Sequence, residues 1–490
     1  MAQGHMIPMV EIAKLLASCG AMATIVTTPL NSARFRSSLK RATDELGLLI
    51  NLVELPFPCV EAGLPEGCEN ADTLPSFAYL GHMAKAAAMM EPQVESLFEN
   101  MRVKPACIIS DFVLPYTNNV AKKFNVPRIS FHGFSCFNLF CMHCIRLHED
   151  EIVRTVGYSA HEYFVLPGLP GEIKYTKVQM PIEIREPGND DPKYEFHDSV
   201  EKAESEVYGV IVNSFEALES EYFSGYKNSK QGKVWCVGPV SLTNLHDLDK
   251  LQRGTSDISL AHHSLDWLNT KEPKSVLYVC LGSICNLSSE QLMELALGLE
   301  ASGKPFVWAF RDTEITKDLY KWIVDDEYED RVAGRGLVIR GWVPQVSILS
   351  HDSIGGFLTH CGWNSSLEGI SAGIPLITWP LFADQFSNEK LLVEVLGIGV
   401  KVGAERPTYH VELGKEDKEV RVRRGDVERA VRLVMEESGE EGDGRRNRAK
   451  ELAEMAKRAM ESGGSSHRSV GMLIDDIMKH QEEKEYCKKL

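Results

Sequence analysis

The segment Trp342–Gln385 reads WVPQVSILSHDSIGGFLTHCGWNSSLEGISAGIPLITWPLFADQ and has the clearest periodicity in the chain. An apolar run ends at Thr359, a glycine-containing turn follows, and helical spacing begins near Trp363. The pattern predicts strands at 354–358 and 375–378 and helices at 363–372 and 384–396. Strands that alternate with helices in this way are typical of a parallel sheet with helices on both faces.

The same alternation continues outward from this segment. Further strands are predicted at 21–27, 49–54, 106–110, 210–213, 275–280, 305–310 and 337–339. Further helices are predicted at 8–19, 115–124 and 289–301. Because 490 residues exceed what one ordinary core holds, the sequence predicts an α/β protein of two doubly wound, Rossmann-like domains that face each other across a cleft.

The domain boundary is expected near residue 240, where Gly238–Pro239 precedes a polar stretch. We expect an N-terminal domain at 1–240, a linker at 241–264, a C-terminal domain at 265–460 and a helical tail at 461–490 that packs back on the N-terminal domain. The segment 436–446 (EESGEEGDGRR) is predicted to be a charged loop.

The composition narrows the class of protein. A formal net charge of −17 argues against a nucleic-acid binder. No apolar run reaches the roughly 18–20 residues that a membrane-spanning helix needs, and no signal-peptide pattern opens the chain. Twelve scattered cysteines suit a reducing compartment better than a disulfide scaffold. We therefore expect a cytoplasmic, monomeric enzyme without a transmembrane segment.

The turn His360–Gly362 and the start of the next helix have the features of an anion-binding site. The first N–H groups of a helix are unpaired, and the helix dipole favours negative charge there. Asn364 and Ser365 add side-chain donors to this first turn. Glu368 lies one turn later on the same helix face, where a carboxylate could accept from ribose hydroxyls.

Trp342 before this turn and the pair Asp384–Gln385 after it complete a possible sugar-nucleotide site. The indole offers a flat face for a base, and the polar pair suits sugar hydroxyls. Each residue by itself also has a simpler interpretation, as a helix cap, a core tryptophan or a hydrogen-bonded strand-end histidine. Two other classes lack their motifs: no GxGxxG of an NAD-dependent oxidoreductase follows a first strand, and no GxxxxGK[ST] of a P-loop NTPase occurs.

Taken together, the segment resembles, nearly position by position, the plant secondary product glycosyltransferase box of the plant UDP-glycosyltransferases. The resemblance covers essentially the whole chain and implies a GT-B fold and a hexosyltransferase. The final Gln of the box implies UDP-glucose as donor. It implies UDP contacts from Ser283, Trp342, Val343, Gln345, His360, Gly362, Asn364, Ser365 and Glu368. It implies sugar contacts from Trp363, Asp384, Gln385 and His132.

The same resemblance places the catalytic pair in the first half. The run GHMIPM at 4–9 is similar to the family's segment around its catalytic base, which makes His5, just before a helix expected to begin near Pro8, the base. Asp111, at a predicted strand end, matches the partner carboxylate. The implied mechanism is a single inverting displacement in which His5 accepts the acceptor's proton and UDP leaves. No metal and no other cofactor is expected, because His360 and a helix N-terminus would hold the leaving group's charge.

The HMIPM start and the FHG run at 131–133 resemble the subgroup that glucosylates flavonoids, phenylpropanoids, steroids and terpenoids, or cytokinins. The segments 55–80 and 149–192 are expected to shape the acceptor pocket. A cluster with zinc-like spacing also occurs, but its apolar, helical context favours a wall of that pocket. Its members are Cys136, Cys141, His143, Cys144 and His148.

The sequence departs from the family at its start. Members have a strand before the segment that matches AQGH, and this sequence begins inside that segment. We therefore expect the first sheet to lack one strand and Met1 not to be the native start. A second function follows from this expectation, that of a truncated UDP-sugar-binding protein with impaired transferase activity.

Overall fold

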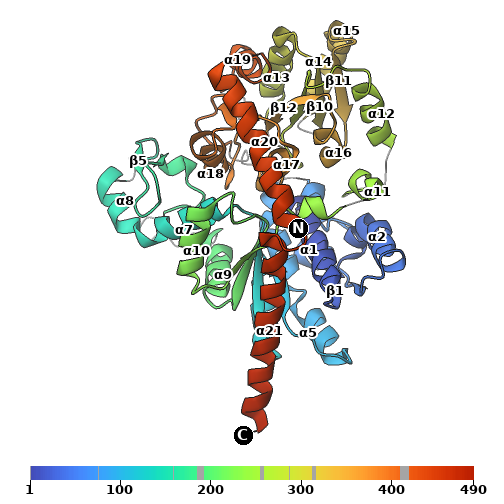
Figure 1. Cartoon of the computed structure of the whole chain (residues 1–490), viewed down its shortest axis with the longest axis vertical. Helices are drawn as coiled ribbons and strands as arrows, with labels where there is room; N and C mark the ends of the chain where they lie inside the picture. The colour runs from blue at the N-terminus through green and yellow to red at the C-terminus, as the bar shows by residue number, and fades with distance from the viewer. Residues whose placement is uncertain are drawn as a thin grey trace.

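The structure is a computed structural model that describes residues 2–75, 77–157, 159–184, 193–244, 246–253, 259–285, 287–311, 316–408, 419–436 and 438–489. Parts of the expected acceptor segments (76, 158 and 185–192), linker (245 and 254–258), charged loop (437) and tail (490) lie outside the described residues. The fold has the predicted class, since two α/β domains built on parallel strands lie one above the other in Figure 1.

The C-terminal domain contains a six-stranded parallel sheet in the order β11–β10–β9–β12–β13–β14. Its strands are β9 (Val276–Cys280), β10 (Phe306–Phe310), β11 (Gly336–Arg340), β12 (Ile354–Thr359), β13 (Leu376–Thr378) and β14 (Gly399–Lys401). Most side chains of β9, β10 and β12 are buried, as expected for a parallel sheet covered on both faces. The strand order reverses between β9 and β12, so a topological switch point lies beyond Cys280 and Thr359.

Helices pack on both faces of this sheet. They are α13 (Ser289–Ser302), α14 (Lys317–Asp325), α15 (Tyr328–Arg331), α16 (Gln345–Leu349), α17 (Trp363–Ala372), α18 (Gln385–Lys390) and α19 (Arg424–Met435). The helix predicted at 384–396 is shorter than expected, because α18 passes into a π-helical turn, Leu391–Val395.

The strands of the N-terminal domain form two parallel sheets and a short antiparallel pair. One sheet pairs β1 (Ala23–Thr27) with β2 (Ile50–Glu54). The other has the order β3–β4–β7–β8, with β3 (Ile108–Asp111), β4 (Arg128–His132), β7 (Gly209–Val212) and β8 (Val234–Cys236). The antiparallel pair is β5 (Phe164–Val165) and β6 (Lys174–Tyr175).

The helices of this domain are α1 (Gln3–Ser18), α2 (Pro29–Asp44), α3 (Cys59–Ala62), α4 (Leu80–Ala88), α5 (Glu91–Asn100), α6 (Tyr116–Lys123), α7 (Cys136–Leu147), α8 (Glu149–Val156), α9 (Lys193–Ser205) and α10 (Ser220–Ser229). Helix α1 lies against both parallel sheets. Ile7 clusters with Ile25 beside β1 and β2, while Ile12 clusters with Ile129 of the four-stranded sheet. Within the described residues neither β1 nor β3 pairs with a second strand, so one helix spans the two sheet edges.

Two segments differ from their expected structure. The linker contains α11 (Asp247–Leu251) and the start of α12 (Ser259–Leu268), and Arg41 of α2 binds Asp249. The charged loop predicted at 436–446 is wrong from Glu440 onward, where α20 (Glu440–Met460) begins. Acidic side chains in the first turn of α20 are favoured by the helix dipole, and packing along α17 supplies the burial that the charged sequence does not suggest.

Helices α20 and α21 (Ser465–Lys489) connect the domains along one side of the molecule (Figure 1). Helix α20 packs on α17, and α21 continues over β8 of the N-terminal domain. Leu473 of α21 shares an apolar cluster with Ile12 and Trp235, and Ser466 Oγ donates to the Gly238 carbonyl at 2.6 Å.

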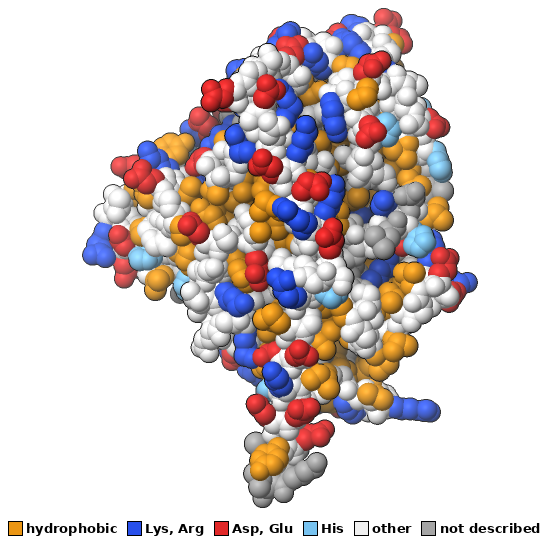
Figure 2. All heavy atoms as spheres, viewed as in Figure 1, with side chains coloured by type: hydrophobic (Ala, Val, Ile, Leu, Met, Phe, Trp, Pro, Cys, Tyr) orange, Lys and Arg blue, Asp and Glu red, His pale blue; other side chains and the backbone are white. Residues whose placement is uncertain are grey.

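The surface carries no broad basic patch on the face drawn in Figure 2, where acidic and basic side chains alternate. Nor does any helix in the described part of the chain have the length and apolar character needed to cross a membrane.

Candidate functional site

The switch point of the C-terminal sheet holds His360 between two glycines. His360 follows β12, and a Cβ placed on Gly282, just after β9, would lie 2.6 Å from its Nε2. A Cβ on Gly362 would collide with the same nitrogen. Glycine at both positions therefore leaves the room that the imidazole occupies.

His360 is neutral at neutral pH. Burial lowers its pKa to about 4, because a charged ring would lose its hydration. Its Nδ1 is buried and has no hydrogen-bond partner among the described residues. The ring can thus offer a ligand one N–H group but no positive charge.

The N-terminus of α17 supplies further donors at the same point. Gly362 precedes the helix and has no side chain with which to cap it. Ser366 N donates to the Gly362 carbonyl at 3.0 Å, whereas the N–H groups at 363–365 precede the first intrahelical acceptor. These groups and the dipole of α17 favour an anion such as a diphosphate.

The side chain of Asn364 connects the two domains. Its amide nitrogen donates to the Gly4 carbonyl of α1, and its amide oxygen accepts from Asn213 at 3.3 Å. Because both ends of this amide are already paired, the backbone N–H of Asn364 is left to contact a diphosphate unless a ligand displaces these two side-chain hydrogen bonds. Ser365, beside it, accepts from Gln345 Nε2 at 3.0 Å.

Helix α1 begins five residues before the predicted start at Pro8. A proline inside a helix leaves the carbonyl four residues earlier without its usual donor. Here that carbonyl belongs to Gly4, and the amide of Asn364 supplies the missing hydrogen bond. The helix can thus continue back through His5, which lies in its first turn.

His5 and Asp111 form a close pair. Their Nδ1 and Oδ2 atoms lie 2.7 Å apart, and the other carboxylate oxygen of Asp111 accepts from Val113 N at 3.1 Å. Burial of the imidazole would lower its pKa, but the charge and hydrogen bond of Asp111 outweigh burial, so the pKa is raised. The carboxylate fixes one ring nitrogen, which leaves Nε2 to accept a proton from a bound hydroxyl.

Asp384 lies near this pair, since its charge acts on His5. Burial raises the pKa of Asp384 to about 6, against the effect of a hydrogen bond from Asn388 at 2.7 Å. Gln385, the next residue, accepts from Leu381 N at 2.8 Å and so shapes the loop before α18.

Two residues expected to contact the sugar have buried rings. The Trp363 indole is 2% exposed and donates to the Asn213 carbonyl at 2.7 Å, so the ring belongs to the core. His132 is 5% exposed, and its Nε2 lies 2.7 Å from a carboxylate oxygen of Glu204. The indole N–H of Trp363 is thus already paired in the core, which leaves this residue only its backbone for a sugar.

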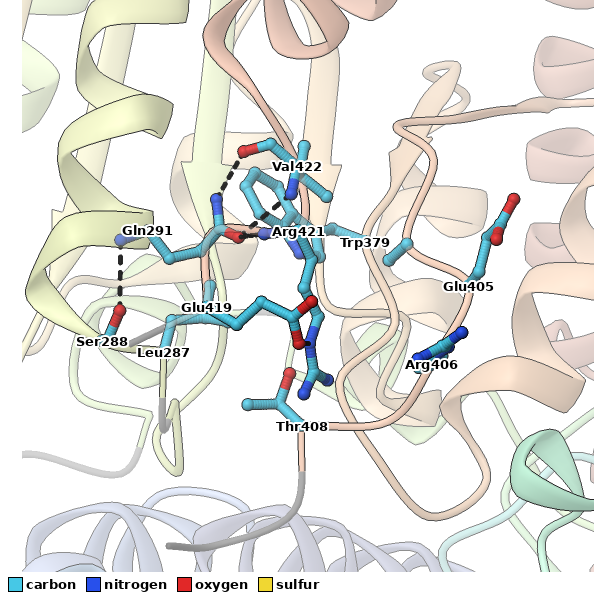
Figure 3. A pocket seen from close by; sticks show the side chains of 11 residues that line it. Leu287, Ser288, Gln291, Trp379, Glu405, Arg406, Thr408, Glu419, Arg421 and Val422 are labelled. Atoms are coloured by element: carbon cyan, nitrogen blue, oxygen red, sulfur yellow. Dashed lines mark hydrogen bonds and ion pairs between the residues drawn. The ribbon is translucent and has the colours of Figure 1, made fainter. Parts of the chain in front are cut away.

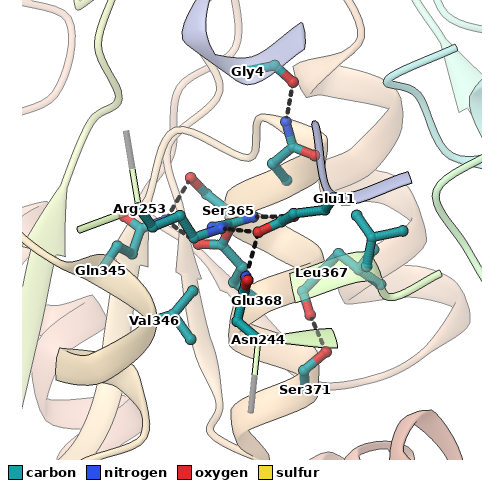
Figure 4. A network of polar contacts seen from close by, with 12 residues as sticks. Gly4, Glu11, Asn244, Arg253, Gln345, Val346, Ser365, Leu367, Glu368 and Ser371 are labelled. Carbon is teal, nitrogen blue, oxygen red and sulfur yellow. Dashed lines mark hydrogen bonds and ion pairs between the residues drawn. The ribbon is translucent and has the colours of Figure 1, made fainter. Parts of the chain in front are cut away.

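Gln345 and Glu368, two of the residues expected to bind the nucleotide, point toward each other in Figure 4. Gln345 donates to Glu368 Oε2 at 2.7 Å. The side chain of Val343 is buried, while the indole of Trp342 donates to the carbonyl of Arg253 at 3.1 Å.

Ser283, another of the expected UDP contacts, lies at the domain interface. Its carbonyl accepts from Arg311 Nη1 at 3.0 Å, and Arg311 Nη2 donates to the Asp72 carbonyl of the N-terminal domain at 3.0 Å. Gly282, Ser283 and Arg311 also line a hollow next to His360.

A second hollow is lined by other residues of the C-terminal domain (Figure 3). Gln291 of α13 accepts there from the backbone N–H groups of Arg421 and Val422, at 2.9 and 3.1 Å. None of the residues expected to bind UDP, sugar or acceptor lines it, so the candidate site is the domain interface.

The cysteines with zinc-like spacing have separate partners in the core. Cys136 Sγ lies 3.5 Å from Cys236 Sγ, and Cys141 Sγ lies 3.3 Å from the Tyr175 hydroxyl. Over the described ranges, no three His, Cys, Asp or Glu residues are grouped so that they could hold a metal ion.

Four polar residues that join the domains were not predicted from the sequence: Glu11, Asn213, Asn244 and Arg253. None belongs to a motif. The one available signal was Glu11, a charged residue within the apolar run that becomes α1.

The chain is similar to known proteins over nearly its whole length. The family UDP-glucoronosyl and UDP-glucosyl transferase matches residues 244–408. UDP-glycosyltransferase 73C12 of Barbarea vulgaris is 51% identical over 479 residues, which cover 98% of this chain and 95% of the relative. UDP-glycosyltransferase 73C5 of Arabidopsis thaliana is 51% identical over 483 residues, with 98% and 96% covered.

Solved structures show the same fold. The structure of Glycyrrhiza uralensis UGT73P12 complexed with glycyrrhetinic acid 3-O-monoglucuronide has a TM-score of 0.89 and 35% identity, with 100% of this chain and 96% of that chain covered. Phytolacca americana UGT2, complexed with UDP-2-fluoro-glucose and pterostilbene, has a TM-score of 0.72 and 27% identity, with 97% of each chain covered.

Proposed function

The chain belongs to the family of UDP-glucuronosyl and UDP-glucosyl transferases, and on that premise we propose that it is an inverting enzyme that transfers glucose from UDP-glucose to a hydroxyl group of a small plant metabolite. The observation that carries the proposal is that His5 lies 2.7 Å from Asp111 and belongs to the helix whose Gly4 carbonyl accepts a hydrogen bond from Asn364 of the donor domain. The proposed base, His5, and the anion site at the start of α17 are thus held close together by this contact between the two domains.

The proposed reaction needs one base and one set of donors. His5 Nε2 takes the proton of the acceptor hydroxyl while Asp111 stabilises the imidazolium. The acceptor oxygen attacks the anomeric carbon, and the bond from that carbon to UDP breaks. The N–H groups at the start of α17 and of His360 hold the charge that develops on the diphosphate, so the proposal includes no metal.

Glucose as donor is supported by the resemblance at Gln385 and by the Phytolacca structure with UDP-2-fluoro-glucose. The acceptor is proposed to be a flavonoid, phenylpropanoid, terpenoid, steroid or cytokinin. In support, the solved relatives are complexed with pterostilbene and with glycyrrhetinic acid 3-O-monoglucuronide. We also propose a cytoplasmic monomer, which light scattering and a fluorescent fusion in plant cells would test.

The test is turnover with UDP-glucose and a panel of flavonoids, stilbenes, triterpenols and cytokinins. We expect a β-glucoside by mass spectrometry and NMR, unchanged activity in EDTA, and lower rates with UDP-galactose and UDP-glucuronic acid. Loss of activity in EDTA that magnesium restores would contradict the proposed mechanism, and an α-glucoside would contradict inversion.

A second candidate, UDP-sugar binding without transfer, is favoured by the division of the N-terminal sheet beneath α1. If the two sheets do not hold α1 firmly, His5 cannot keep its position over the donor. Calorimetry that shows UDP binding, with no glucoside and no UDP release across the whole panel, would select this candidate.

A further inference from the structure

Arg253 contacts three parts of the molecule at once (Figure 4). Its Nε and Nη2 donate to Glu11 of α1 at 2.7 and 3.1 Å, and its Nη1 donates to Glu368 of α17. Its backbone carbonyl accepts from the Trp342 indole at 3.1 Å. One residue of the linking segment therefore contacts the residues expected to hold base and ribose, and also the helix that carries His5.

The charged side chains of this cluster are shielded from water. Those of Arg253, Glu11 and Glu368 are 11%, 4% and 5% exposed. Asn244 adds a further donor to Glu11 at 2.5 Å. Burial opposes the charge of the guanidinium, but the two carboxylates outweigh burial and raise its pKa, so Arg253 stays a cation.

Glu368 can still accept from a ligand. Its Oε1 accepts from Arg253 and its Oε2 from Gln345 at 2.7 Å. A carboxylate has about four lone-pair sites, so about one per oxygen is left for a ribose hydroxyl. Two donors fix the plane of the carboxylate before a ligand arrives, which lowers the entropy that binding must offset.

We propose that Arg253 is a positioning residue for the nucleotide: it holds the Glu368 carboxylate in the orientation that the ribose hydroxyls need, and through Glu11 it links the donor site to the helix of the base. The inference rests on the proposed function, because it takes Glu368 as the ribose-binding residue.

The test must avoid leaving two buried carboxylates without a counter-ion, which can unfold a protein. The double variant Arg253→Met with Glu11→Gln removes one charge of each sign and keeps the net charge of the cluster. Arg253→Lys keeps the positive charge but loses the planar fork. Arg41→Met with Asp249→Asn is the matched control, because it breaks an ion pair of the same linking segment that contacts neither Trp342 nor Glu368.

Calorimetry with UDP and with 2′,3′-dideoxy-UDP gives the readout. We expect wild-type protein and the control to prefer UDP by roughly tenfold or more. In the Arg253→Met, Glu11→Gln variant, UDP should bind roughly tenfold more weakly, while dideoxy-UDP changes little, so that the preference nearly disappears. The preference of Arg253→Lys for UDP should lie between that of the wild type and that of the double variant.

Four outcomes would overturn the inference. The double variant, still folded by its melting temperature, could keep the wild-type preference, or it could bind UDP more tightly because Arg253 merely fills the ribose position. Equal losses of affinity for both nucleotides would show that Arg253 only stabilises the structure and does not orient Glu368 for the ribose. If wild-type protein itself does not bind UDP, the proposed function fails, and the inference fails with it.

Discussion

The carbonyl of Gly4, one residue before the proposed base, accepts a hydrogen bond from the side-chain amide of Asn364, 360 residues away at the start of the donor-site helix. The bond exists because Pro8 has no N–H to offer that carbonyl. A proline in one domain thus creates an acceptor for the other. Base and anion site are joined by a contact between the helices that carry them.

Pro8→Ala tests this relationship. Alanine restores the intrahelical donor to Gly4, which then competes with Asn364. We expect kcat to fall by roughly 2- to 10-fold, the range that loss of one hydrogen bond gives, while the melting temperature does not fall. Steady-state kinetics and thermal melts measure both. A variant with wild-type kcat would show that the Asn364 contact is not needed for transfer.

If His5 is the base proposed above, His5→Ala should abolish detectable transfer and leave the Kd for UDP unchanged. A general base contributes roughly 10²- to 10⁴-fold to the rate. Single-turnover kinetics and calorimetry on the same sample separate the two quantities. Loss of UDP affinity in this variant would contradict the assignment of His5 as base.

The pH profile should report the same pair. The raised pKa of His5 means that the imidazole is protonated, and unable to act as base, at pH values below that pKa. Activity should therefore fall as the pH drops through it. In Asp111→Asn the raising charge is gone, so the acid limb should move to lower pH while kcat falls. If the acid limb of Asp111→Asn stays at the wild-type pH, a group other than His5 controls that limb.

The two glycines around His360 allow a matched test. Gly282 has a φ of 81° and its Cβ would meet His360, whereas Gly303 has a φ of 69° and open space. Alanine at either position costs ~1–2 kcal/mol of backbone strain. Only Gly282→Ala should also weaken UDP binding, by roughly tenfold or more. Similar UDP affinities in Gly282→Ala and Gly303→Ala would show that His360 does not bind the diphosphate.

The stability of the protein should depend on pH through Glu219. Burial raises its pKa to about 7, although Phe137 N donates to it at 2.7 Å. A carboxyl with a raised folded-state pKa stabilises the protein below its unfolded pKa of 4.5, and this contribution is lost as the pH rises through about 7. At ~1.4 kcal/mol per pKa unit, the loss is about 3 kcal/mol.

Glu219→Gln should therefore reduce the fall in urea-unfolding free energy between pH 5 and pH 8. Glu389, whose pKa burial also raises to about 7, remains in both proteins and supplies the common background. Parallel pH dependences in wild type and variant would show that Glu219 is ionised in the folded state.

The sequence by itself determined the donor side of the site. The strand, turn and helix around His360 are adjacent in the chain, and a helix N-terminus attracts anions through its own backbone. Helix α17 consequently has the predicted bounds, Trp363–Ala372. The resemblance of GHMIPM and of the strand that ends at Asp111 to a known family also predicted that His5 and Asp111 form a pair, although 106 residues separate them in the sequence.

Tertiary structure alone decided what crosses between the domains. Local pattern placed a helix start at Pro8, but Asn364 lets α1 begin at Gln3. The resemblance implied a sugar contact from Trp363, but its ring is buried in the core. No motif marked Arg253, which joins Glu11 to Glu368. Backbone propensity acts over a few residues, whereas the partner of a buried polar group is fixed only when distant elements pack together.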